Sequence, residues 1–394
     1  MNEIALIDAS SRMSGVEFST LYLAQHLDRS HGSPMVVCPA EGDLPAHCRA
    51  AGIPVFLVSQ ARFFSTSVRF AGLTILNPFA LVLDAIALVV SARALARFLR
   101  AQRPALVVPK GLVAQFYGGL AARWAGIPCV WHVQDRVSER VGPFFPWTMA
   151  LASRVLAREI IADAESIARQ LRPWAPPARI SIIPNGVDTH EFSPQVDGSA
   201  VRAEWGVPPN QLLVGVVGRL TPWKGQHVLI RAWARIADQF PNASVVLVGA
   251  PLFENGNYPR ELRSTVERLG LTNRIIFAGF RWDMPQVLAA LDIVAHPALE
   301  KDSSPLAVVS AMAAGKPIIC SRIDGTAQLF DDGVDGLLVP PGDVAALADT
   351  LALLLSDANL RTRLGCAARA RAERELSVEQ FARRCAAVFE RALA

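Results

Sequence analysis

The chain has 394 residues and a formal net charge of +4, and 52% of its residues are hydrophobic against 19% charged. The length favours two domains, and the composition excludes wholesale disorder because so many apolar side chains can be buried. A mild charge without a dense Lys/Arg run argues against a nucleic-acid partner. The six cysteines form no CxxC pair, which argues against a metal centre or a disulfide framework and favours a reducing cytoplasm.

In the first half of the chain, short apolar runs alternate with helix-like segments, which predicts α/β units with parallel sheets. Strands are expected at 4–7, 36–38, 55–58, 106–108, 129–133, 160–161 and 180–183. Helices are expected at 17–27, 79–100, 112–124, 147–157 and 165–171. These elements make up a predicted N-terminal domain over 1–184. Its first residues lack a basic stretch followed by an apolar core, so no signal peptide is expected.

The segment 73–90 is strongly apolar and invites comparison with a membrane helix. Three residues interrupt it: Asn77, Pro78 and Asp84. Four arginines follow it: Arg93, Arg97, Arg100 and Arg103. A spanning helix needs about 20 apolar residues in a row and tolerates a carboxylate poorly. A buried domain helix is the simpler interpretation, and an interfacial helix with its arginines facing anionic headgroups is the alternative.

Turn-forming residues cluster at 185–209, which is the predicted interdomain linker. The alternation then restarts, with strands expected at 212–217, 244–248, 275–278, 293–296 and 318–320 and helices at 226–239, 260–269, 284–291 and 305–314. A second domain is therefore predicted over 210–377, followed by an amphipathic helix at 378–394. The expected fold class is α/β, with two Rossmann-like doubly wound domains facing a cleft, because ligands collect at the carboxyl ends of parallel strands.

The segment 218–225 (GRLTPWKG) joins a predicted strand to a predicted helix and carries two cations. Arg219 offers a planar donor fork and Lys224 a compact point charge, which together suit two adjacent phosphates. An isolated pair of this kind would more simply be a solvent-exposed loop. The flanking Gly218 and Gly225 and the strand–loop–helix setting favour anion binding.

A second anion-binding element is expected at 300–305 (EKDSSP), where a helix begins that stops at Gly315. Polar residues before the helix, proline in its first turn and glycine after its end are typical helix boundaries. Its first backbone N–H groups, around Ser304, Pro305 and Leu306, lack partners within the helix and can receive a phosphate. Alone this would be an ordinary capped helix, but two such elements in one domain support each other.

Several segments together resemble the retaining glycosyltransferases of the GT-B fold, family 4. They are 184–188 (PNGVD), 218–225, 311–319 (AMAAGKPII) and 335–343 (DGLLVPPGD). The similarity is dense from 160 to 346. It is thinner in the N-terminal half, where 14–17 (SGVE) is similar to the family's glycine loop and 131–135 (WHVQD) to its histidine segment.

The resemblance implies transfer of a sugar from a UDP- or GDP-linked donor, with retained anomeric configuration and without a metal or another cofactor. The residues matching Arg219 and Lys224 hold the departing diphosphate in such enzymes, and His132 would lie near the transferred sugar, although it could equally be a structural histidine at a strand end. The C-terminal helix is expected to cross back onto the first domain. Expected catalytic residues are His132, Arg219, Lys224 and Asp302; expected donor-binding residues are Gly15, Gly218, Gly249, Phe280, Arg281, Ser304, Pro305, Leu306 and Ser310.

The chain departs from the family at two positions. The family's two glutamates, separated by seven residues, fall on Asp302 and Ser310. Asp302 keeps the charge that contacts sugar hydroxyls, whereas Ser310 offers the nucleotide ribose one neutral hydrogen bond in place of charge-assisted ones. The expected loss is about 1–3 kcal/mol of donor affinity. Glu300 is also acidic and lies close to these positions in sequence, so a shift in register of one or two residues could let it substitute for a family glutamate.

The expected acceptor is a sugar, a lipid-linked molecule or a polysaccharide precursor. The apolar, arginine-flanked segment 73–103 suggests peripheral contact of the N-terminal domain with the inner face of the cytoplasmic membrane. Ser310 favours one alternative, a weak or inactive GT-B protein that binds a sugar nucleotide or a protein partner. Another GT-B chemistry, such as that of a phosphorylase or an epimerase, is a further alternative.

Overall fold

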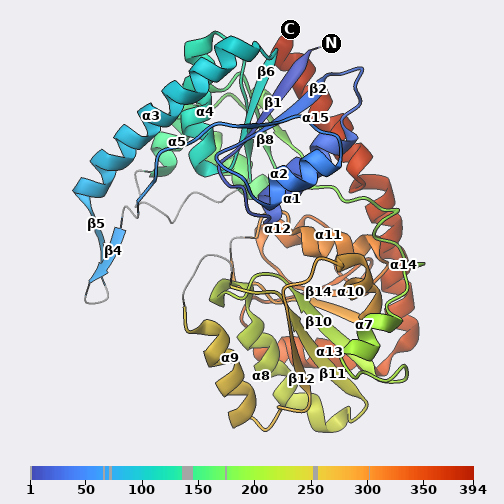
Figure 1. Ribbon diagram of the computed structural model, residues 1–394. Coiled ribbons are helices and arrows are strands. Elements are labelled where there is room, and N and C mark those ends of the chain that lie inside the picture. The colour runs from blue at the N-terminus through green and yellow to red at the C-terminus, as the bar shows by residue number, and fades with distance from the viewer. Residues whose placement is uncertain are drawn as a thin grey trace. The chain divides into compact units, whose positions relative to one another are not determined.

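The computed structural model describes residues 2–394 except 65–66, 71–72, 135–144, 174, 252–255 and 301. Asp135 and Lys301, which belong to two of the motifs above, lie outside the described residues. The chain divides into two compact units (Figure 1). Unit 1 comprises Met1–Gly186 and Val378–Ala394, and unit 2 comprises Val187–Ser377.

Within its described residues, unit 1 has a seven-stranded parallel sheet in the order β3-β2-β1-β6-β7-β8-β9. The strands are β1 (Glu3–Asp8), β2 (Ser33–Cys38), β3 (Val55–Leu57), β6 (Leu106–Lys110), β7 (Val130–Val133), β8 (Glu159–Ala162) and β9 (Ile180–Ile182). The strand order reverses between β1 and β6, which makes this a doubly wound sheet. At the end of these two strands Asp8 pairs in register with Lys110.

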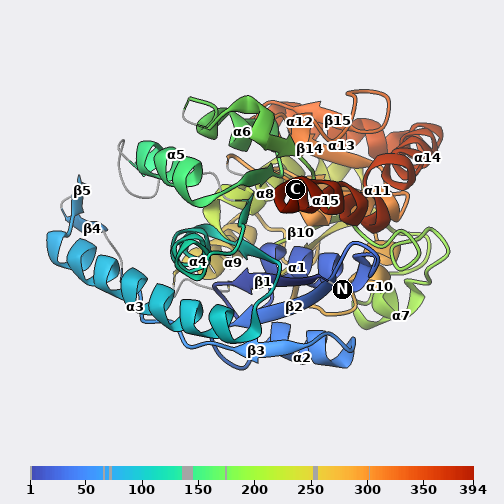
Figure 2. The same cartoon turned by 90° about the horizontal axis from the view of Figure 1, so that it is seen from above.

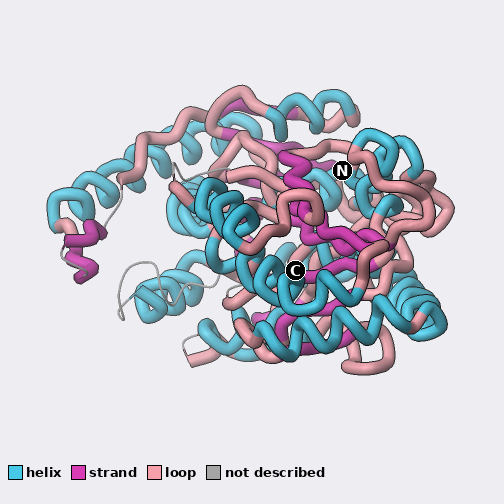
Figure 3. The backbone as a smooth tube through the Cα atoms, turned by 90° about the horizontal axis from the view of Figure 1, so that it is seen from below, coloured by secondary structure: helices cyan, strands magenta, loops and turns pink. Residues whose placement is uncertain are grey.

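Helices cover both faces of this sheet (Figures 2 and 3). The apolar cluster on one face includes α3 (Pro78–Gln102), α4 (Leu112–Ala125), α5 (Phe145–Leu156) and α6 (Glu165–Leu171). The cluster on the other face includes α1 (Gly15–His26), α2 (Asp43–Ala50) and α15 (Val378–Leu393). Helix α15 packs against α1 and β8, because its side chains Phe381, Cys385 and Phe389 are buried there.

The segment 73–90 is not helical throughout. An antiparallel hairpin of β4 (Ser67–Phe70) and β5 (Leu73–Leu76) precedes α3, and the sequence pattern did not predict it. Asn77 then caps α3, since its side-chain oxygen accepts hydrogen bonds from the backbone N–H groups of Phe79 (3.1 Å) and Ala80 (3.3 Å). Proline at the first helical position completes this start signal.

Over its described residues, unit 2 has a six-stranded parallel sheet in the order β12-β11-β10-β13-β14-β15. The strands are β10 (Leu212–Val217), β11 (Ala243–Val248), β12 (Ile275–Gly279), β13 (Ile293–His296), β14 (Ile318–Ser321) and β15 (Leu337–Val339). The helices are α7 (Ser199–Glu204), α8 (Gln226–Ile236), α9 (Tyr258–Arg268), α10 (Met284–Ala290), α11 (Leu306–Ala313), α12 (Asp324–Ala327), α13 (Val344–Ser356) and α14 (Ala358–Glu375). Two parallel doubly wound sheets confirm the predicted GT-B fold class.

The segment 185–209 is not a free linker, since nearly all of it belongs to unit 2 and it contains α7. The start of α7 lies so close to α10 that a Cβ on Gly198 would come within 2.2 Å of the Ala290 nitrogen. Arg202 then donates hydrogen bonds to the Ala290 carbonyl (2.7 Å) and to Asp292 (3.1 Å). Turn-forming composition alone did not reveal these contacts, because they depend on residues about ninety positions away in sequence.

Candidate functional site

The loop 218–225 leaves β10 at the point where the strand order of unit 2 reverses. Chain continuation runs from β10 towards β11 and β12, while β13 lies on the other side of β10. A sheet of this kind opens a crevice at such a reversal, outside the carboxyl ends of its strands. The predicted cationic loop and the segment that follows β13 therefore lie at the two sides of this crevice.

Glycines hold the strand ends of this crevice close together. The Gly218 N–H donates to the Val248 carbonyl (2.9 Å), and the Gly249 N–H donates to the Gly279 carbonyl (2.7 Å). Gly249 has φ +142°, and a Cβ there would come within 2.0 Å of the Gly218 carbonyl oxygen. Only glycine fits this position, so the ends of β10, β11 and β12 expose backbone where a ligand can approach closely.

A second close approach joins the cationic loop to the segment after β13. Gly225 has φ +72°, and a Cβ there would lie 1.8 Å from the Pro297 carbonyl oxygen. The Leu299 N–H also donates to the Trp223 carbonyl (2.8 Å). These two contacts place Lys224 beside the residues that lead into α11.

The result is a partly buried cluster of Lys224, Asp302 and His296. Asp302 Oδ2 accepts a hydrogen bond from Lys224 Nζ and another from His296 Nε2 (2.6 Å). The Lys224 and Asp302 side chains are 13% and 12% exposed, and that of His296 is 2% exposed. Lys224 Nζ also lies 4.6 Å from the centroid of the Trp223 ring, a cation–π contact. His296 was not predicted as a site residue, and its only sequence signal was its place at the end of a strand.

Opposing effects set the charges of this cluster. Burial by itself raises the pKa of Asp302, but the Lys224 charge and the hydrogen bonds from Lys224 and His296 outweigh it and hold that pKa below its usual range. Burial lowers the pKa of His296, although Asp302 opposes this. At neutral pH the cluster is therefore a Lys–Asp ion pair with a neutral imidazole that donates to the same carboxylate oxygen.

Helix α11 begins four residues after Asp302. Its N-cap is Pro305, whose side chain makes no capping hydrogen bond. The loop at 302–303 rests on the start of α12, because a Cβ on Gly325 would come within 1.8 Å of the Asp302 carbonyl. Ser304 is buried just before the helix, and Ser310 is buried one turn inside it. The N-terminal end of α11 and Lys224 thus offer positive charge suited to an anion, with the Asp302 carboxylate paired to Lys224.

Two further predicted donor-binding residues follow β12. The rings of Phe280 and Trp282 are exposed and meet edge to face with their centroids 5.0 Å apart. Arg281 instead forms ion pairs with Asp283 (2.7 Å) and Glu204, so its side chain is engaged within unit 2.

Arg219 lies in the cationic loop, where its carbonyl accepts a hydrogen bond from the Gln226 side chain (2.8 Å).

In unit 1, the predicted site residue His132 lies in β7, and its contact with a sugar stays a prediction. The residue is fully buried, its ring lies against Phe381 of α15 with the ring centroids 6.0 Å apart, and neither ring nitrogen has a hydrogen-bond partner. Burial and the nearby Lys110 charge lower the pKa of His132, which keeps the ring neutral. The histidine was assigned from its motif, and the packing of a helix from the far end of the chain encloses it.

Gly15 is the exposed first residue of α1, and space is open around the position that a Cβ would take. The loop before it lies above buried charged residues that the sequence did not single out. Glu17 accepts a hydrogen bond from Ser14, Asp8 accepts one from Thr20, and Lys110 donates to Ser19 (3.0 Å). Burial raises the pKa of Asp8 to about 7 and lowers that of Lys110 to about 8.

Among the residues that the structure describes, no group of three or more His, Cys, Asp or Glu side chains is placed to hold a metal ion.

Comparison with known families agrees with this architecture. The model named Glycosyltransferase Family 4 matches residues 13–191, and the model named Glycosyl transferases group 1 matches residues 198–371. The chain belongs to the GT-B glycosyltransferases. HepE of Anabaena, solved in complex with UDP and glucose, is 27% identical with a TM-score of 0.85, and the match covers 99% of this chain and 100% of that one. Sucrose-phosphate synthase from Thermosynechococcus elongatus is 18% identical with a TM-score of 0.78. That match covers 99% of this chain and 98% of the synthase chain, and it shows the same fold.

The matches to curated relatives cover a smaller part of the chain. D-inositol 3-phosphate glycosyltransferase of Corynebacterium glutamicum is 38% identical over 197 residues, but the match spans only 48% of this chain and 47% of that relative. UDP-Gal:alpha-D-GlcNAc-diphosphoundecaprenol alpha-1,3-galactosyltransferase of Escherichia coli is 28% identical over 67% of this chain and 69% of the relative.

Proposed function

We propose that the protein transfers a sugar from a UDP-linked donor to a lipid-linked acceptor, with retention of anomeric configuration and without a metal ion. The observation that carries this proposal is the cluster of Lys224, Asp302 and the N-terminus of α11 at the strand reversal of unit 2. UDP is favoured over GDP because HepE, which matches the whole chain, was solved with UDP-glucose.

The donor diphosphate would replace Asp302 as the ion-pair partner of Lys224. Lys224 is paired with Asp302, and a diphosphate bound at α11 would provide the ammonium with a stronger anionic partner. Asp302 keeps its hydrogen bond from His296 and turns its released charge to the sugar hydroxyls. As the bond between the anomeric carbon and the phosphate oxygen breaks, its electron pair passes to the diphosphate, which Lys224, Arg219 and the helix N-terminus stabilise. The acceptor hydroxyl oxygen bonds to the anomeric carbon, and its proton leaves with the diphosphate.

The lipid-linked acceptor rests on the exposed apolar surface of unit 1 and on the E. coli relative, whose name specifies a diphosphoundecaprenol acceptor. The 79–102 part of α3 is long and apolar enough to cross a membrane by length and composition, with a mean hydropathy of 2.1 and one third of its most apolar window buried. However, Asp84 accepts a hydrogen bond from the Phe64 N–H (2.7 Å), and α3 packs along α4. These contacts favour a helix of unit 1 that contacts the cytoplasmic leaflet over a helix that spans it.

A second exposed apolar stripe supports the same membrane contact. On α5, Trp147, Leu151 and Val155 follow one another at helical spacing and are each more than half exposed. Helix α4 packs against both α3 and α5, so the two exposed stripes belong to the same helical layer.

The second candidate function is that of a weak or inactive GT-B protein that binds a sugar nucleotide or a protein partner. Ser310 favours it, because a buried hydroxyl stands where the family has a ribose-binding carboxylate. Slow hydrolysis of UDP-sugars by the purified protein separates the two candidates. Turnover that Lys224→Ala abolishes supports the enzyme, whereas a thermal shift with UDP-sugars but no turnover supports the binding protein. If no nucleotide or nucleotide sugar raises Tm, the enzyme and the sugar-nucleotide-binding protein are both wrong, because a ligand at one hundred times its Kd adds about 2.7 kcal/mol. Only a GT-B protein that binds a protein partner would then remain.

A further inference from the structure

The outer side of α3 carries one continuous stripe whose chemistry changes along the helix. Its members recur at spacings of three and four residues and fall within a sector of about 100° around the axis. They are Phe79, Val82, Leu83, Ile86, Val90, Arg93, Arg97 and Arg100. All eight are exposed, with Phe79 at 81% and Ile86 at 55%. The first half of the stripe is therefore apolar and the second half is basic.

This arrangement differs from that of a helix lying flat on a membrane. A flat amphipathic helix keeps an apolar face and a polar face along its whole length. Here the two characters occupy successive turns of the same face. In Figures 1 and 2 the start of α3 extends beyond the sheet of unit 1 with the β4–β5 hairpin at its end. If α3 enters a membrane with its N-terminal end deepest, the apolar half of the stripe contacts the acyl chains and the basic half contacts the headgroups.

The dimensions fit such an oblique approach. From Val82 to Arg97 the helix rises about 22 Å, since each residue adds about 1.5 Å. One leaflet contributes about 15 Å of hydrocarbon to the bilayer. A helix tilted into one leaflet therefore places Val82 and Ile86 among the acyl chains and Arg97 at the headgroups.

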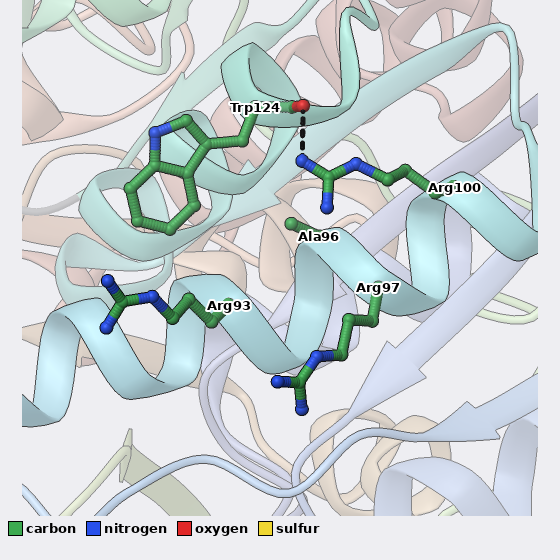
Figure 4. Close-up of a pocket in the computed structure, with 5 residues that line it drawn as sticks. All are labelled: Arg93, Ala96, Arg97, Arg100 and Trp124. Atoms are coloured by element: carbon green, nitrogen blue, oxygen red, sulfur yellow. Dashed lines mark hydrogen bonds between the residues drawn. The ribbon is translucent and has the colours of Figure 1, made fainter.

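A pocket lies at the level of the arginines. Its volume is about 470 Å³, and it is lined by Arg93, Ala96, Arg97, Arg100 and Trp124 (Figure 4). The small side chain of Ala96 leaves room between Arg93 and Arg100, while Trp124 closes the side formed by α4. Arg100 donates a hydrogen bond to the Trp124 carbonyl (2.8 Å), which fixes the position of its guanidinium. Tryptophan is enriched at membrane interfaces, where its apolar ring and N–H group are both satisfied.

The charge of this pocket is not balanced by any carboxylate among the described residues. In the described part of the chain no carboxylate forms an ion pair with Arg93, Arg97 or Arg100. Like charges at these helical spacings repel one another, so a bound anion would relieve the repulsion. Guanidinium groups bind phosphate with two parallel hydrogen bonds, which suits the pocket to a phosphate group.

We infer that this pocket binds the phosphate of an anionic phospholipid headgroup while the first turns of α3 enter the hydrocarbon of one leaflet. This rests on the membrane contact proposed above and adds its ligand and its geometry. The arginines hold this part of α3 at the level of the headgroups, and the apolar turns set how deeply the helix enters the leaflet. The headgroup pocket thus fixes how unit 1 is oriented towards a lipid-linked acceptor.

The first test compares binding to vesicles of phosphatidylcholine alone and of phosphatidylcholine with phosphatidylglycerol. Arg93→Gln/Arg97→Gln removes two charges from the pocket, and the exposed pair Arg383→Gln/Arg384→Gln on α15 removes two charges elsewhere. Each basic residue near an anionic surface contributes about a fivefold gain in partitioning, so the pocket variant should lose about 25-fold on anionic vesicles. The α15 variant should bind like the unaltered protein. Equal losses in the two variants would contradict the pocket.

A conservative variant distinguishes phosphate binding in the pocket from non-specific electrostatic attraction to the anionic membrane. Arg93→Lys/Arg97→Lys keeps both charges but loses the planar fork. It should recover only part of the lost binding to anionic vesicles. Full recovery would show that charge alone acts, and the assignment of a phosphate site would then be wrong.

The second test measures depth with spin labels at Val82→Cys, Val90→Cys and Arg97→Cys. The exposed Cys366 is first replaced by serine, since the other cysteines are buried. Depth should decrease from position 82 to position 97. Equal depth at all three positions would mean that α3 lies flat, and the oblique geometry would be wrong. If the protein binds no vesicle at all, the membrane contact itself fails, whereas a Tm shift with UDP-sugars would leave the donor proposal intact.

Discussion

Lys224 and Asp302 form an ion pair although they lie 78 residues apart in sequence. The pair exists because a glycine at position 225 lets the cationic loop touch the Pro297 carbonyl, which brings the chain after β13 alongside Lys224. The same carboxylate oxygen accepts from the buried His296. A loop cation, a carboxylate and a strand-end imidazole thus act as one unit next to the N-terminus of α11.

Lys224→Ala should reduce kcat/KM for donor hydrolysis or transfer by about 100-fold or more, because it removes a preorganised positive charge from the departing diphosphate. Arg235→Ala serves as the control, since it removes an exposed cation from α8 in the same unit. Steady-state kinetics with UDP-sugars measure both. A Lys224→Ala enzyme with unchanged kcat/KM would remove Lys224 from the proposed mechanism.

His296→Asn should weaken the site less than the loss of Lys224, because it removes one hydrogen bond to a charged group and not the charge itself. Such hydrogen bonds contribute about 1.5–3 kcal/mol, which corresponds to roughly 10- to 150-fold in kcat/KM. The measurement is the kcat/KM of this variant beside Lys224→Ala. If His296→Asn were as active as the unaltered protein, the imidazole would only pack the strand end.

Ser310→Ala should weaken donor binding by about 2- to 10-fold if its hydroxyl makes a neutral hydrogen bond to the ribose. Ser310→Glu should tighten binding if the pocket accepts the longer side chain, because a carboxylate forms stronger hydrogen bonds with hydroxyls. Calorimetric Kd values for UDP and for a UDP-sugar provide the readout. Unchanged Kd values in both variants would place Ser310 away from the ribose.

Gly249→Ala should be strongly destabilising, because its Cβ would meet the Gly218 carbonyl at 2.0 Å in a conformation with φ +142°. Gly270→Ala is a matched control in the same unit, since Gly270 also has positive φ (+69°) but open space around it. The control should lose only about 1 kcal/mol of unfolding free energy. Urea denaturation of the two variants should therefore differ, and similar losses would mean that the strand ends can move apart.

Asp8→Asn should change how stability depends on pH. Burial raises the pKa of Asp8 from 3.8 to about 7, so between these values the folded protein holds a proton that the unfolded chain has released. The contribution of Asp8 to stability is thus present below pH 3.8 and is lost as pH rises towards 7. The variant should lack this fall, and urea midpoints near pH 5 and pH 8 will measure it. Asp349→Asn, at an exposed position, should retain the pH dependence of the unaltered protein.

The sequence determined the fold class and most elements of both sheets, because apolar runs bounded by turn formers are local signals of buried parallel strands. It also placed the two segments predicted to bind anions at strand–loop–helix junctions, where the structure has them, since glycine, proline and capping residues act within a few positions. The hairpin β4–β5 and helices α13 and α14 were missed. The segment 185–209 was taken for a linker because its turn residues are visible in the sequence and its contacts with α10 are not.

Only the tertiary structure decided which of the marked residues work together. It joined Lys224 to Asp302 and added His296, whereas the packing of α15 onto the first sheet enclosed His132. It also aligned the apolar and basic turns of α3 on one exposed face and left a pocket between its arginines and α4. Local propensity acts over a few residues, but burial and pairing depend on contacts between distant segments. For that reason the sequence could identify the cationic loop, and only the packed chain could show what that loop holds.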